Sequence, residues 1–170
     1  MEKGDYKAAI KEFDEALVLP QSLGSGIWNE VKYVPHQYYK AVCLEAIGDN
    51  AAADELYKHI LKLQKDYFTE MHLKALPYYQ ALALRHFGKD LEARAVIDAA
   101  RKDWQKKMYV EDAGFFQTTP FFISFSTKAE VARKACFSSL LGYAEEFIGN
   151  SATAKKYFAD GNDIYGRLYK

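Results

Sequence analysis

The chain has 170 residues, with 23 Lys and Arg against 23 Asp and Glu, and is 49% hydrophobic and 15% aromatic. This composition excludes an intrinsically disordered chain, and the length suits one compact domain or a short repeat array. The balanced charge lacks the basic excess that nucleic acids or anionic membranes attract, so neither is expected as a partner. No apolar run approaches the roughly 20 residues of a transmembrane helix, and the two cysteines form no disulfide or metal spacing. A cytoplasmic location is therefore predicted.

The first predicted element is half of a helical hairpin over residues 1–20. Gly4 is followed five residues later by the small Ala9, and Phe13 comes about one helical turn after that. This order predicts a turn and then a helix. Because no helix precedes the turn, we interpret the chain as a fragment of a larger protein.

Two full helical hairpins are predicted over residues 35–66 and 70–104. The second repeats the first at an offset of 40 residues, the distance from Gly48 to Gly88. The matching residues are Tyr38 and Tyr78, Tyr39 and Tyr79, Ala41 and Ala81, Leu44 and Leu84, and Ala53 and Ala93. The glycine permits a tight turn, and the small residues before and after it let two helices cross closely.

The repeat is interrupted over residues 105–126, which we expect to be a non-helical insertion. It contains FFQTTPFFISF, in which Pro120 and two threonines disfavour a helix. This phenylalanine-rich stretch is expected either to pack within the chain or to mediate self-association.

A last hairpin is predicted over residues 127–170. It keeps Gly142, Gly149, Ala154 and Phe158 at the repeated spacings but has Glu145 where an apolar residue is expected. Glu145 and Glu146 are adjacent, so on a helix they point about 100° apart, and both are interpreted as part of a solvated face.

The recurring glycine turns and small crossing residues resemble the tetratricopeptide repeat, a helix–turn–helix unit. The glycines lie 44, 40 and 61 residues apart, against a tetratricopeptide period of about 34, and a two-helix repeat of the HEAT type is the alternative. The resemblance implies an all-α, right-handed solenoid of about three and a half repeats. The chain also resembles the C-terminal helical tract of bacterial multidomain proteins whose N-terminal β-rich domain has an uncharacterised, carbohydrate-related function.

The tetratricopeptide resemblance implies a groove lined by the first helix of each pair. The positions that correspond to this groove are Tyr38, Val42, Glu45, Tyr78, Leu82, Arg85, His86 and Tyr143. None of them is the lysine or asparagine that clamps a peptide carboxylate in some arrays of this kind. Tyrosines here could anchor a partner, or could simply pack between neighbouring units.

The sequence contains no motif for catalysis, a metal or a cofactor. The four histidines are not paired at helical spacing, and no cysteine or serine lies in a nucleophile motif. We therefore predict a non-catalytic interaction module that binds another protein or its own N-terminal domain. The alternative is an accessory part of a carbohydrate-active enzyme that contacts the catalytic domain or the sugar.

Overall fold

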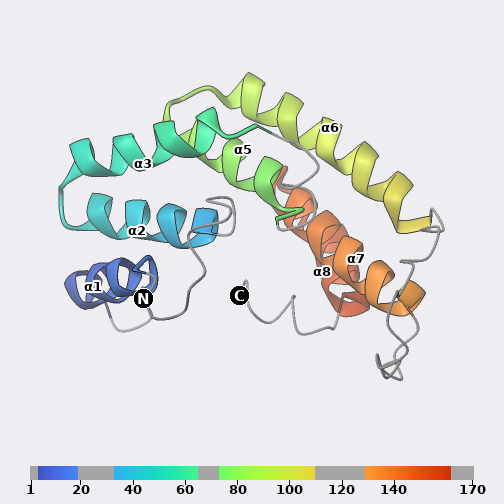
Figure 1. Cartoon of the computed structure of the whole chain (residues 1–170). Coiled ribbons are helices and arrows are strands. Elements are labelled where there is room, and N and C mark those ends of the chain that lie inside the picture. The colour runs from blue at the N-terminus through green and yellow to red at the C-terminus, as the bar shows by residue number, and fades with distance from the viewer. Residues whose placement is uncertain (1–3, 19–32, 65–72, 110–128, 162–170) are drawn as a thin grey trace, which may run out of the picture. The chain divides into compact units, whose positions relative to one another are not determined.

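The computed structural model describes residues 4–18, 33–64, 73–109 and 129–161. These residues form seven α-helices and no strand (Figure 1). The helices are α1 (Tyr6–Ala16), α2 (Val34–Ala46), α3 (Asn50–Lys62), α5 (Leu76–His86), α6 (Asp90–Tyr109), α7 (Ala129–Phe147) and α8 (Ser151–Asp160). The prediction of an all-α protein is confirmed for this part of the chain.

The chain divides into two compact units, Met1–Val96 and Ile97–Lys170, and the division falls inside α6. In the first unit α1 packs on α2, α2 packs on α3, and α5 contacts both α2 and α3. In the second unit α7 and α8 pack against each other as a hairpin (Figure 1). Each unit is described below by itself.

Three short turns join successive helices, and all three have the same hydrogen bonds. The backbone N–H of Gly48 donates to the carbonyl of Glu45, and that of Asp49 donates to Leu44, each at 2.9 Å. The turns at Gly88 and Gly149 repeat this pattern, and all three glycines have positive φ. This is the Schellman motif, in which glycine takes the left-handed conformation after a helix. The glycine turns predicted from the sequence are confirmed.

Local signals also fix where the helices begin. Asp5 and Asp49 are the N-cap residues of α1 and α3, and their side chains accept hydrogen bonds from Ala8 N and Ala52 N. Such caps satisfy backbone N–H groups that the first helical turn leaves without partners. Helices α2 and α5 instead carry a proline in the first turn, where its missing N–H and fixed φ are tolerated.

The small residues predicted at helix crossings are buried. Ala41, Ala53, Ala81 and Ala93 are fully buried in the first unit. In the second unit, a Cβ atom added to Gly142 would lie 2.6 Å from the Phe158 ring, so only glycine fits there without a shift. The close helix packing expected at these positions is therefore present.

Helix α6 is longer than expected. The predicted insertion begins at residue 105, but α6 continues to Tyr109. Trp104 and Met108 lie one turn apart and are both buried, and Lys107 pairs with Asp103 at 3.0 Å, so the helical periodicity persists. The phenylalanine-rich residues 115–125 lie outside the described residues, and their packing or self-association stays a prediction.

Substitution of Ala53 or Ala93 by leucine should destabilise the protein by about 1–3 kcal/mol, because neither site has room for three more carbon atoms. Ala51 and Ala95 lie on the same helices but are exposed, and leucine there should change stability by less than about 0.5 kcal/mol. Thermal melts of the four variants would check this. Equal melting temperatures for the buried and exposed substitutions would contradict the crossing assignment.

Candidate functional site

Six of the residues predicted to line a groove occupy matching positions on two helices of the first unit. We call them the α2–α5 face: Tyr38, Val42 and Glu45 on α2, and Tyr78, Leu82 and Arg85 on α5. Spacings of four and three residues put the three members from each helix on one side of that helix. Arg85 is exposed and the other five side chains are partly exposed, whereas the neighbouring Ala41 and Ala81 are fully buried.

Tyr38 connects the α2–α5 face to an aromatic cluster. Its ring centroid lies 5.4 Å from that of Tyr39, 5.8 Å from Tyr57 on α3 and 5.6 Å from Tyr79 on α5. Tyr79 in turn meets the ring of Tyr78 at 5.6 Å. Tilted and edge-on contacts at these distances are favourable for aromatic pairs. Tyr38 therefore packs between elements, as the simpler of its two sequence interpretations predicted, while part of its side chain stays exposed.

Charged side chains from both α2 and α5 affect the pKa of Tyr38. Burial, the neighbouring Tyr39 and the Glu45 carboxylate raise the pKa of Tyr38 to about 12, and Arg85 opposes this shift. Burial also raises the pKa of Tyr39. Both hydroxyls are therefore neutral at physiological pH and can donate a hydrogen bond.

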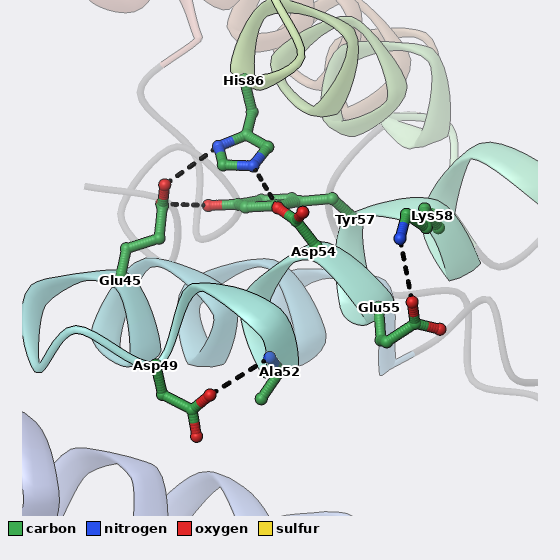
Figure 2. A network of polar contacts seen from close by, with 8 residues as sticks. All are labelled: Glu45, Asp49, Ala52, Asp54, Glu55, Tyr57, Lys58 and His86. Atoms are coloured by element: carbon green, nitrogen blue, oxygen red, sulfur yellow. Dashed lines mark hydrogen bonds and ion pairs between the residues drawn. The ribbon is translucent and has the colours of Figure 1, made fainter.

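His86 is held by three side chains from the α2–α3 hairpin (Figure 2). Its Nδ1 lies 2.9 Å from Glu45 Oε1 on α2, and its Nε2 lies 2.8 Å from Asp54 Oδ1 on α3. Its ring also stacks on Tyr57, with the centroids 4.2 Å apart and the planes 32° apart. The predicted residues Glu45 and His86 are thus brought into direct contact.

Tyr57 completes this polar cluster from below the imidazole ring. Its hydroxyl donates to Glu45 Oε2 at 2.7 Å, and burial together with this hydrogen bond raises the pKa of Tyr57. The two oxygens of Glu45 are therefore both engaged, one with Tyr57 and one with His86. These contacts fix α5 against the α2–α3 hairpin.

The expected exposure of Tyr143 is wrong. This residue is only 9% exposed, and its ring meets that of Phe158 on α8 at 5.1 Å. Gly142, next to Tyr143, lets the Phe158 ring approach α7 closely. Tyr143 therefore belongs to the packing of the α7–α8 hairpin and is not a surface residue.

The interpretation of Glu145 as solvated is also wrong, whereas Glu146 is exposed as expected. Glu145 is 3% exposed, and its Oε1 lies 3.0 Å from Arg101 Nη2 on α6. Its Oε2 accepts a hydrogen bond from Asn150 Nδ2 at 2.9 Å. A buried carboxylate requires such partners, and the sequence signal for them was its place at a repeat position that is otherwise apolar.

Sequence reasoning also missed Asp54 and Tyr57 as partners of His86, because nothing in a helical repeat pattern links them to a residue on another hairpin.

No group of three or more His, Cys, Asp or Glu side chains within the described ranges could hold a metal ion. None of the described helices is long and apolar enough to cross a membrane. Comparison of the chain with protein-family models, curated proteins and solved structures gave no match.

Proposed function

We propose that the chain is a tetratricopeptide-like interaction module without catalytic activity, and that the α2–α5 face binds a protein segment with apolar side chains. The observation that supports this is that one side of α5 is buried and another side is partly exposed. Tyr79 is 2% exposed, whereas Tyr78 and Leu82 are partly exposed. The same positions on α2 carry Tyr38 and Val42, so two helices offer an aromatic and an aliphatic side chain at equivalent places.

The chemistry of these side chains suits a protein partner. Tyrosine provides a large contact area with few rotatable bonds, and it is enriched among the residues that dominate binding energy in interfaces. Valine and leucine add apolar surface, and a complex gains stability when the partner removes that surface from water. Arg85 is exposed beside this area and can donate to a backbone carbonyl or a carboxylate of the partner.

The carbohydrate-contacting alternative has less support. A sugar site needs clustered polar side chains such as Asp, Asn and Arg that form hydrogen bonds with hydroxyl groups. Glu45 is the acidic member of the α2–α5 face, and both its oxygens already interact with Tyr57 and His86. Sugar binding would require one of these contacts to be given up.

A library of displayed random linear peptides, selected against the whole chain, provides a probe of the α2–α5 face. Changing Tyr78 or Leu82 to alanine should weaken binding of the selected peptides about tenfold or more, as measured by calorimetry. Tyr109 is a matched control, since it is a tyrosine on α6 that is 73% exposed and lies outside the face. Its change to alanine should leave the affinity unaltered.

Two outcomes would contradict the proposal. One is that the selected peptides bind the Tyr78 and Leu82 variants as tightly as the unchanged chain. The other is that a series of neutral and acidic oligosaccharides binds the chain and loses affinity in the same two variants, which would favour the carbohydrate-contacting alternative.

A further inference from the structure

His86 makes a contact that joins two successive elements of the first unit. It lies at the end of α5, whereas Glu45 and Asp54 lie on the two helices of the preceding hairpin. Figure 2 shows the imidazole ring between the two carboxylates, with one ring nitrogen turned toward each. The distances of 2.9 and 2.8 Å are those of direct hydrogen bonds.

The number of protons on His86 decides whether this contact is favourable. An ionised carboxylate can only accept a hydrogen bond, so each ring nitrogen must donate one. Only the imidazolium ion carries a proton on both nitrogens. A neutral imidazole would place a lone pair against one of the two carboxylates, and the interaction there would become repulsive.

The groups around His86 favour a positive charge on its ring. Glu45 on α2 and Asp54 on α3 are the acidic groups in contact with it, and the neutral Tyr57 ring covers one face. Arg85, the neighbouring residue on α5, is the nearby cation, and its guanidinium lies 3.8 Å from Asp90. The two carboxylates attract a proton to the ring, whereas Arg85 repels it. Arg85 has the weaker effect because Asp90 offsets part of its charge.

We propose that Glu45, Asp54 and His86 form a protonation-dependent clasp that holds α5 against the α2–α3 hairpin. The clasp closes when His86 is an imidazolium ion and loosens when it becomes neutral. Histidine is the side chain whose ordinary charge change falls closest to physiological pH, which makes it the usual element of such a device. This inference is independent of any partner of the α2–α5 face.

The sign of the pH effect follows from proton linkage. The contact is complete only while both ring nitrogens of His86 carry a proton, so the stabilisation that it provides is lost as pH rises and the imidazole becomes neutral. Tyr57 takes no part in this titration, because its raised pKa keeps the hydroxyl neutral.

The direct test is an NMR titration of the imidazole nitrogens in the full chain. The titration midpoint of His86 should be lower in the Asp54→Asn and Glu45→Gln variants than in the unchanged protein. Glu55→Gln is the matched control, since Glu55 is the next residue on α3 but pairs with Lys58 at 2.9 Å (Figure 2). It should leave the midpoint unaltered. Equal midpoints in all four proteins would overturn the proposal.

Stability gives a second and separate test. His86→Phe retains a ring to stack on Tyr57 but removes the charge, so this variant should still fold. Between about pH 5.5 and about pH 8.5, the Tm advantage of the unchanged protein over this variant should shrink by roughly 3–8 °C. The other three histidines are present in both proteins, so their titration cancels in the difference. A Tm difference that is constant over this range would also overturn the proposal.

Discussion

Replacement of Tyr79 by alanine should lower the free energy of unfolding by about 3–5 kcal/mol. Tyr79 is 2% exposed, and its ring meets those of Tyr38 from α2 and Tyr78 from its own helix. Its removal would leave a cavity between α5 and the preceding hairpin, where the surrounding helices can close it only in part.

The same change at Tyr78 provides the matched control. Tyr78 is the adjacent residue, but its side chain is partly exposed, so truncation removes less buried area and should cost about 1 kcal/mol or less. Urea denaturation followed by circular dichroism would measure both values. A loss at Tyr78 as large as that at Tyr79 would mean that Tyr78 is a packing residue, and the α2–α5 face would then lose one of its two tyrosines.

A series of aromatic contacts connects the α2–α5 face to the core of the first unit. Tyr79 contacts Tyr38, Tyr38 contacts Tyr57, and Tyr57 stacks on His86. A partner that covers Tyr38 would therefore contact a ring that is linked to His86 through Tyr57 alone. Stability and affinity need to be measured on the same variants, because a change in this cluster can alter both.

Much of the local structure could be predicted from the sequence. Gly48, Gly88 and Gly149 recur with small residues at fixed distances, and this pattern follows from the backbone geometry of a tight helix–helix turn. It identifies helices and their crossing points because these depend on residues close together in the chain. The Schellman turns and the buried alanines confirm this part of the prediction.

The contacts between distant residues could not be predicted in this way. Tyr143 matches the repeat position of the partly exposed Val42 and Leu82, but the ring of Phe158 from the following helix packs against it. Glu145 and Glu146 have the same sequence surroundings, and their opposite environments depend on which side of α7 faces Arg101. The partners of His86 likewise come from another hairpin, and repeat spacing carries no information about them.

The ion pair of Glu145 and Arg101 should have a large effect on stability when only one partner is removed. Arg101→Met would leave the Glu145 carboxylate buried without the guanidinium beside it, with the hydrogen bond from Asn150 still present, and should lower the free energy of unfolding by about 3–5 kcal/mol. Glu145→Ala should cost less, about 2–3 kcal/mol, because Arg101 is partly exposed and also lies 3.5 Å from Asp98. Trp104 is buried in the same unit, so its fluorescence can follow unfolding there once Trp28, the other tryptophan of the chain, is replaced by phenylalanine.

The double variant Glu145→Leu with Arg101→Met should restore most of the lost stability and bring it to within about 1 kcal/mol of the unchanged protein, or above it. Leucine is the residue that the first two hairpins carry at this position, as Leu44 and Leu84. Glu146→Ala is the control, because this exposed neighbour should change stability by less than about 0.5 kcal/mol. If Glu145→Leu does not recover the stability lost in Arg101→Met, the carboxylate and the guanidinium do not stabilise each other, and the buried position of Glu145 needs another explanation.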